Sequence, residues 1–254
     1  MRWIKILILT ATITHLEGCQ TRGPNPVDPY EPINRKIFKF NEVFDKVVLQ
    51  PPAKLYVTIV PAPVRAGVNN VYMNVNMIPT VVNDILQADF QQAIKDTWRF
   101  IINTGFGIGG IFDPAAARFK LPRHSNDLGL TFAHWGDQHS PYLMIPFLGP
   151  STLRDWMGTI FEYTFFTPYP YIASMGTLYG VLSFRYVDLR SQMLDNDRLL
   201  AEAIDRYALL RDAYLQHRNY LLHPEQSDAG DTGALYVEDD AFGSTKAPIA
   251  EPTQ

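Results

Sequence analysis

Apolar residues recur at helical spacing over most of the chain. From Pro32 onward they step alternately by four and three positions, at Ile33, Ile37, Phe40, Phe44 and Val47. This spacing places them along one face of a helix, and charged residues occupy the opposite face. Such a stripe can lie in a membrane interface or pack into a protein core, and the pattern favours neither. Pro51-Pro52 is expected to end this helix.

A second helix is predicted to begin after Asp89, whose side chain suits the N-cap position. We expect its apolar side to be buried through Phe90, Ala93, Ile94, Thr97, Trp98, Ile101 and Ile102. The glycine-rich segment that follows matches G-x-G-x-x-G at Gly105, Gly107 and Gly110. That motif indicates dinucleotide binding only after a strand, and here a helical pattern precedes it, so we reject it. The glycines instead allow a close backbone approach or a hinge.

An uncharged segment over residues 66–83 is rich in asparagine. Its valines share one helical face, whereas Asn69 and Asn76 lie seven residues apart on another, and Pro79 is expected to start a new turn. Buried amides need hydrogen-bond partners, while a solvated helix would normally carry charges. The pattern fits either a wall between an apolar layer and a wet cavity, or a solvent-facing asparagine-rich helix. Asn69, Asn76 and Asn83 are our candidates for such a channel wall.

Aromatic residues dominate residues 156–186, in which only Glu162 and Arg185 are charged. Pro168 and Pro170 interrupt the uncharged run. We therefore expect either two shorter helices that join at an aromatic corner and dip into a bilayer, or a large aromatic core. In the first arrangement Glu162 faces a wet interior, which makes it a fourth candidate for the channel wall.

A polar stretch over residues 118–140 carries several groups capable of chemistry, namely His124, Asp127, His134, Asp137 and His139. Their spacing matches no zinc motif and no G-x-S-x-G nucleophile elbow. We therefore predict no catalytic residues, no metal site and no cofactor. Alternating apolar residues indicate a short strand over 128–132. A helix capped by Ser151 and a final helix from Asp197 to Leu221 complete the expected elements.

Composition narrows the class of protein. Charged residues make up 19% and aromatic residues 13% of the 254 residues, so the chain is unusually apolar for a protein in water. The net charge of -4 comes from the acidic end of the chain, and the near-neutral body argues against nucleic-acid binding through a basic field. The single cysteine excludes a disulfide scaffold. We expect the body to contact an apolar phase.

Both ends of the chain are expected to lie outside the folded body. Residues 1–18 combine a basic start with a short apolar stretch, as in a secretory signal peptide. Leu16-Glu17-Gly18-Cys19 resembles a bacterial lipobox, which makes Cys19 the predicted lipid anchor. Residues 19–31 are expected to form a tether, residues 32–222 the helical domain, and residues 223–254 a disordered acidic tail.

A set of short motifs then resembles the MlaA (VacJ) lipoprotein family. The matching segments occur in order along residues 19–222: Asp28-Pro29-Tyr30-Glu31, Asn34-Arg35, Phe38-Lys39-Phe40-Asn41, Val60-Pro61-Ala62-Pro63-Val64-Arg65, the run from Asn83 to Asp89, Arg99-Phe100, Asn103-Thr104, Gly107-Ile108-Gly109-Gly110, Gly129-Leu130-Thr131-Phe132, Pro141-Tyr142 and Ser151-Thr152-Leu153-Arg154-Asp155. Each motif is weak alone, and the set is specific.

The resemblance implies a mainly α, ring-shaped lipoprotein embedded in the inner leaflet of the outer membrane of a Gram-negative bacterium. A central amphipathic channel would pass mislocalised glycerophospholipids from the outer leaflet to the periplasmic carrier MlaC. The resemblance also implies association with trimeric porins of the OmpC and OmpF type. A hinge and a hairpin would close the channel, and we place them at Gly107, Gly109 and Gly110 and loosely over residues 112–132.

Two other functions stay open at this point. A structural lipoprotein that scaffolds porins predicts a closed core without a channel. A phospholipid hydrolase predicts His134 within hydrogen-bond reach of an acid and a nucleophile.

Overall fold

A computed structural model describes residues 25–137 and 139–223, most of which are helical. The first half contains α2 (Glu31–Phe44), a π-helical turn η1 (Asp45–Leu49), α3 (Gln50–Ile59), α4 (Ala62–Leu86), α5 (Phe90–Gly105), α6 (Pro114–Phe119) and α7 (Leu128–His134). The second half contains β1 (Tyr142–Ile145), β2 (Gly149–Thr152), α8 (Leu153–Phe165), η2 (Tyr169–Tyr171), α9 (Met175–Gln192), η3 (Leu194–Asn196), α10 (Asp197–Glu202) and α11 (Arg206–Leu222).

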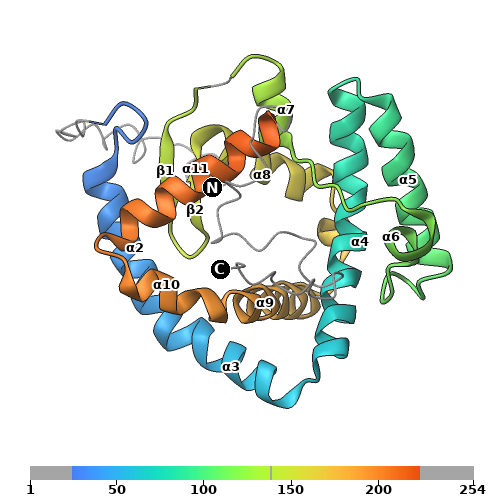
Figure 1. Cartoon of the computed structure of the whole chain (residues 1–254), viewed down its shortest axis with the longest axis horizontal. Coiled ribbons are helices and arrows are strands. Elements are labelled where there is room, and N and C mark those ends of the chain that lie inside the picture. The colour runs from blue at the N-terminus through green and yellow to red at the C-terminus, as the bar shows by residue number, and fades with distance from the viewer. Residues whose placement is uncertain (1–24, 138, 224–254) are drawn as a thin grey trace, which may run out of the picture.

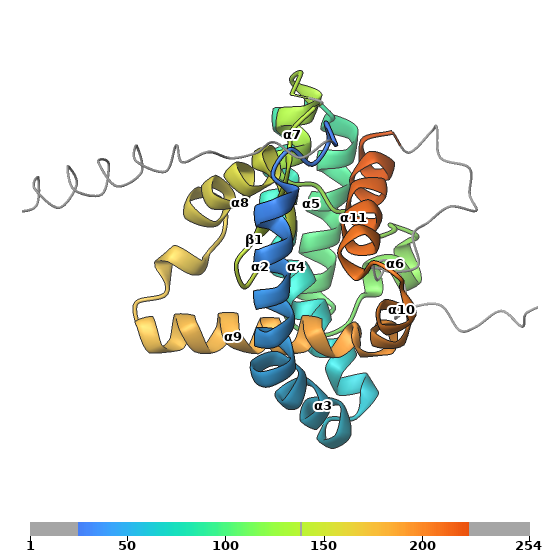
Figure 2. The ribbon, with the colours of Figure 1, turned by 90° about the vertical axis from the view of Figure 1, so that its left-hand side faces the viewer.

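The helices are arranged as a ring, which confirms the predicted mainly α architecture. In Figure 1, α2 and α3 run along the left and the bottom, α4 and α5 stand on the right, and α7, α8 and α11 lie across the top. Seen from the side in Figure 2, α9 lies across the direction of α2 and α4. Helix α9 contacts both α3 and α4, so it braces the lower part of the ring.

Polar caps set where several helices begin. Asp89 accepts a hydrogen bond from the backbone N–H of Gln92 at 3.0 Å, so the predicted start of α5 is confirmed. Helix α8 begins one residue later than predicted, because Thr152 rather than Ser151 accepts the bond from the backbone of Asp155. Each cap satisfies a backbone donor that the helix itself leaves unpaired.

Two predictions about prolines are wrong. Pro79 lies inside the continuous helix α4 and does not start a new turn. Two side-chain bonds flank the proline: the Thr80 hydroxyl donates to the Asn76 carbonyl and the Asn83 side chain donates to the Pro79 carbonyl, both at 2.9 Å. Pro51-Pro52 stands in the first turn of α3, where proline's missing N–H costs nothing. The helical conformation therefore continues from α2 through η1 into α3, past the two prolines.

The strand predicted over 128–132 is also wrong. These residues form α7, because Asp127 caps the backbone N–H of Leu130 at 2.9 Å and starts a helix. The hairpin lies instead at β1 and β2, which pair antiparallel with Ile145 opposite Gly149, and not over residues 112–132. Its tight turn has positive φ at Phe147 and Gly149, a conformation that the alternation of apolar residues does not reveal.

The aromatic segment forms two helices, α8 and α9, joined through η2, as the prolines predicted. The final helix is divided, because Asp205 caps α11 separately from α10, so its predicted continuity is wrong. Within the described residues, no helix combines the length and the apolar character needed to cross a bilayer.

A conventional apolar core joins α2, the hairpin and α11. Phe38, Tyr142, Met144 and Tyr207 form it, with the rings of Phe38 and Tyr207 edge to face at 5.7 Å. The N-terminal segment belongs to this core region, because Asp28 is fully buried and accepts from the Asn34 side chain at 2.8 Å. The folded body therefore begins before residue 32, within the predicted tether. Residues 1–24 and 224–254, including Cys19 and the acidic tail, lie outside the described residues.

Candidate functional site

Helix α5 turns its apolar side outward. Phe90, Ile94 and Trp98 are 62%, 60% and 54% exposed, whereas Asp96 and Arg99 on the opposite side are buried. The prediction that the apolar stripe of this helix is buried is confirmed for Ala93 and Ile102 and is wrong for the other five residues, Phe90, Ile94, Thr97, Trp98 and Ile101. Periodicity identifies the two faces of a helix, but it does not say which face points into the protein.

The apolar stripe that begins on α2 is divided between the two alternatives, because part of it faces outward while Ile37 packs against the apolar core. Ile33, Phe40 and Val47 are exposed, while Asn34 is buried. We call the outward apolar residues of α2, η1 and α5 the apolar exterior: Ile33, Phe40, Val47, Phe90, Ile94, Trp98 and Ile101. Each Å² of apolar surface left in water costs about 25 cal/mol, and apolar exposure of this kind marks a membrane or protein contact.

The asparagines of α4 connect helices across the ring. Asn69 is buried and accepts from Arg185 Nη1 on α9 at 2.7 Å. Asn83 is fully buried and accepts from the Thr131 hydroxyl on α7 at 2.8 Å. Asn76, midway between them in the sequence, is half-buried. The three candidates therefore lie on the side of α4 that meets α9 at one end and α7 at the other.

Glu162 on α8 lies close to the same surface. Its Oε1 atom is 3.5 Å from the donating Nδ2 of Asn83, and its Oε2 atom is 3.4 Å from the donating backbone nitrogen of Leu128. Burial raises the pKa of Glu162 to about 7, and the negative charge of Asp127 adds to the rise while Arg218 opposes it. The carboxyl group is thus close to half-protonated at neutral pH.

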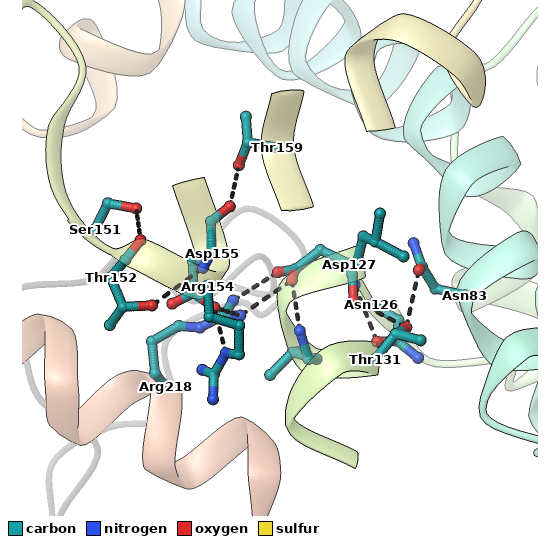
Figure 3. Close-up of polar contacts among 12 residues, drawn as sticks. Asn83, Asn126, Asp127, Thr131, Ser151, Thr152, Arg154, Asp155, Thr159 and Arg218 are labelled. Atoms are coloured by element: carbon teal, nitrogen blue, oxygen red, sulfur yellow. Dashed lines mark hydrogen bonds and ion pairs between the residues drawn. The ribbon is translucent and has the colours of Figure 1, made fainter. Parts of the chain in front are cut away.

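A charge network joins α7, α8 and α11 (Figure 3), and the charges of its Asp127 and Arg218 act on Glu162. Arg218 Nη1 lies 2.5 Å from Asp127 Oδ2, and Nη2 lies 2.8 Å from Asp155 Oδ1. Arg154 Nε lies 3.0 Å from Asp155 Oδ1, and Tyr214 donates to Asp155 Oδ2 at 2.7 Å. We call these residues the Arg218 network. Burial raises the pKa of Asp127, but Arg218 outweighs it and holds that pKa below its ordinary value.

Two glycines allow this network to form. A Cβ atom at Gly129 would lie 2.3 Å from Asp155 Oδ1, and one at Gly158 would lie 2.6 Å from the backbone nitrogen of Gly129. Helices α7 and α8 therefore cross in direct backbone contact.

A second charge cluster lies between α4, α5 and the segment before α7. His124 Nδ1 is 2.7 Å from Asp96 Oδ2 and 3.8 Å from Asp84 Oδ1. We call Asp84, Asp96 and His124 the acidic trio. Burial raises the pKa of Asp84 to about 6, and the neighbouring Asp96 carboxylate adds to the rise. Burial lowers the pKa of His124, but the two carboxylates outweigh it and raise that pKa above its ordinary value.

The glycine segment forms a tight turn between α5 and α6. A Cβ at Gly107 would meet the carbonyl oxygens of Asn103 and Phe112 at 2.4 Å, and one at Gly110 would meet Asn74 at 2.6 Å. Gly109 has a positive φ of 68°. The geometry shows the close backbone approach that the sequence allowed, and the hinge stays a prediction.

The polar stretch contributes residues to both clusters, but not in the combination considered from the sequence. His124 belongs to the acidic trio and Asp127 to the Arg218 network. His134 is exposed and makes no side-chain hydrogen bond to an acid or hydroxyl within residues 25–137 and 139–223. The geometry that a hydrolase would need at His134 is therefore absent from that part of the chain.

Sequence reasoning missed Asp84, Asp96, Asp155 and Arg218. Asp96 lies on the side of α5 opposite to the apolar side that we expected to be buried. A polar residue among apolar neighbours is a weak signal, and nothing local indicates which distant segment will supply its partner.

An apolar exterior around a polar, hydrogen-bonded interior defines a class of protein, a helical ring that contacts lipid or an apolar partner with its outer side. The model of the MlaA lipoprotein family matches residues 26–221. The chain therefore belongs to the MlaA lipoprotein family, and the resemblance seen in its motifs is confirmed.

Relatives and a solved structure agree with this placement. The intermembrane phospholipid transport system lipoprotein MlaA of Escherichia coli (strain K12) is 32% identical over 248 residues, which cover 93% of this chain and 96% of that protein. An uncharacterized protein of Rickettsia bellii is 35% identical over 206 residues, covering 81% and 79%. A structure solved to explain maintenance of bacterial outer membrane lipid asymmetry matches with a TM-score of 0.68 at 33% identity, covering 77% of this chain and 98% of that one.

Proposed function

We propose that this chain is an outer-membrane lipoprotein that removes mislocalised glycerophospholipids from the outer leaflet and passes them to a periplasmic carrier. The observation that carries the proposal is the apolar exterior on a ring whose relatives are named for intermembrane phospholipid transport. A protein that works wholly in water would turn the apolar sides of α2 and α5 inward, because their exposure to water is costly.

In this proposal the ring sits in the inner leaflet of the outer membrane, anchored through lipid on Cys19. The apolar exterior lies among acyl chains or against a porin trimer of the OmpC and OmpF type. The periplasmic side delivers the lipid to a carrier of the MlaC type. These placements are supported by the chemistry of the exterior, which presents apolar and aromatic side chains on both α2 and α5.

The lipid path is proposed to follow the candidate wall of Asn69, Asn76, Asn83 and Glu162. Asn76 and Glu162 are partly exposed and would face the lipid, whereas Asn69 and Asn83 are buried and would hold the wall together through their bonds to Arg185 and Thr131. A phospholipid needs polar groups for its head group beside an apolar surface for its tails. Uncharged amides meet this need without holding an ionic head group too tightly. The turn at Gly107, Gly109 and Gly110 is proposed as the hinge that changes access to this path.

The function is tested by measuring outer-leaflet phospholipid in cells that lack the protein. We expect the phospholipid content to rise on deletion, and to return to normal with the wild type but not with Cys19→Ala. If deletion leaves outer-leaflet phospholipid unchanged, the transport proposal is wrong and a structural role beside porins is favoured.

The apolar exterior is tested directly by Trp98→Lys. A lysine at this position exchanges an aromatic contact with lipid for a charge, so we expect binding of the purified protein to phospholipid vesicles to weaken about tenfold or more. Gln216→Lys, which adds the same charge at an exposed position of α11, should leave vesicle binding unchanged. Equal loss in the two variants would show that net charge, not the apolar exterior, sets the affinity.

A further inference from the structure

The acidic trio brings together three side chains that suit a metal ion. Asp84 comes from α4, Asp96 from α5 and His124 from the segment before α7, and one ligand atom from each lies within 4.8 Å of the others. The three come from segments 12 and 28 residues apart, so folding assembles the group. Two carboxylate oxygens and one imidazole nitrogen are a ligand set that Zn²⁺ and similar transition-metal ions accept.

Both carboxylates are buried and incompletely paired. The side chains of Asp84 and Asp96 are 1% and 0% exposed. Asp84 Oδ1 accepts from the Asn126 amide at 2.8 Å, and Asp96 Oδ2 accepts from Gln92 at 3.1 Å. Asp84 Oδ2 and Asp96 Oδ1 accept no hydrogen bond from an N–H or O–H donor of the described residues, and a bond between the two carboxyl groups requires a proton on one of them. Leaving a buried carboxylate oxygen unsatisfied is costly.

The charges in the trio do not balance. Two carboxylates face one imidazole, so even a protonated His124 leaves one negative charge over. Arg99 and Arg123 both pair with the neighbouring Asp113, at 3.0 and 3.3 Å, so this second group leaves one positive charge beside the trio. Asp89 is a further negative charge that acts on His124. A proton on His124, or a bound cation in its place, offsets the negative charge of the two carboxylates.

The geometry points to a binding site for a divalent transition-metal ion of the Zn²⁺ class, held by one oxygen each of Asp84 and Asp96 and by Nδ1 of His124. Ligand atoms around tetrahedral zinc lie about 3.3 Å apart, given metal–ligand bonds of about 2 Å. The distance of 3.8 Å between His124 Nδ1 and Asp84 Oδ1 is compatible with this spacing. The distance of 2.7 Å between His124 Nδ1 and Asp96 Oδ2 would have to increase slightly. His124 is 35% exposed, which gives the ion a route from solvent.

Binding would replace a proton on Nδ1 with the metal ion and would neutralise the surplus charge. It would also join α4, α5 and the segment before α7 at one point. None of the three ligands is one of the four wall candidates, so the metal-binding test and the transport test can fail separately.

The test uses the full-length, untagged protein in detergent, stripped of metal with EDTA and dialysed. We expect calorimetric titration with ZnCl₂ to show one bound ion per chain. Saturation should raise the melting temperature by about 5 °C or more at a hundredfold excess over Kd. His124→Gln and Asp96→Asn should each weaken Zn²⁺ binding by at least about thirtyfold, whereas His134→Gln, which removes an exposed histidine outside the trio, should bind as the wild type does.

Absence of Zn²⁺ binding to the wild type would overturn the proposal and leave a shared proton as the neutralising species. Unchanged binding in His124→Gln would overturn it too. If His124→Gln fails to fold, Asp84→Asn decides, because it removes a charge while keeping the shape. Equal affinity for Mg²⁺ would reject the transition-metal class, since that ion prefers oxygen ligands alone.

Discussion

The Arg218 network and the acidic trio are both buried charge clusters at contacts between helices, and they differ in how their charges are balanced. In the network, two arginines face Asp127 and Asp155, and a tyrosine hydroxyl adds a further donor. In the trio, two carboxylates share one imidazole. The first cluster therefore stores no surplus charge, whereas the second needs a proton or a cation from outside.

This difference separates a structural role from a binding role. A charge-balanced buried network holds helices in register, and removing one member leaves the remaining charges without a partner. An unbalanced one is costly unless something fills it, so it marks a place where the protein can respond to its surroundings. Glu162 lies between these extremes, since it touches Asn83 next to the trio and interacts electrostatically with Asp127 and Arg218.

The largest effect is expected from Arg218→Met. The change leaves the buried Asp155 and the partly exposed Asp127 without their shared cation, so we expect the free energy of unfolding to fall by about 3–4 kcal/mol. Chemical denaturation in detergent measures it. Arg198→Met, at an exposed pair with Glu202, should cost less than about 1 kcal/mol. A similarly small loss in Arg218→Met would show that the network is not a balanced unit.

A smaller effect is expected from the pH dependence of Glu162. Its pKa is raised from 4.5 to about 7 in the folded protein, so its favourable contribution is complete below pH 4.5 and is lost as the pH rises through 7. The loss is at most about 3 kcal/mol. Comparing denaturation of the wild type and Glu162→Gln at pH 5 and pH 8 measures it, because the glutamine does not titrate. Parallel pH profiles for the two proteins would place the titration elsewhere.

The sequence predicted more of the fold than of these clusters. Asp89 and the prolines at 168 and 170 locate helix boundaries because caps and ring constraints act locally. The outward side of α5 could not be predicted in the same way. Its two faces are visible in the pattern, but their direction depends on whether lipid or water surrounds the protein.

The trio and the network were beyond local patterns for another reason. Asp155 and Arg218 are 63 residues apart in the chain, and only the close crossing at Gly129 and Gly158 brings α7 near enough to α8 for the network to form. His124 was noticed as a chemical group, but its partners lie on helices whose inward sides were not identified. Asn69 and Asn76 became candidates for the channel wall because a spacing of seven is a helical signal, and the wall itself stays a prediction.

The smallest effect, and the sharpest test of the contrast, is expected from Asp84→Asn in EDTA. The asparagine keeps the acceptor for Asn126 and removes the surplus charge, so at pH 8 we expect a gain of about 1 kcal/mol in the free energy of unfolding. Because the pKa of Asp84 is raised to about 6, the wild-type acid loses stability as the pH rises through 6. The gain should therefore appear above that pH and vanish near pH 4. The matched change in the balanced network, Asp127→Asn, should destabilise the protein at pH 8, since it breaks a pair with Arg218. If both Asp84→Asn and Asp127→Asn destabilise the protein, the negative charges of the trio are already neutralised in the wild type. The proposed difference in charge balance between the two clusters would then be wrong.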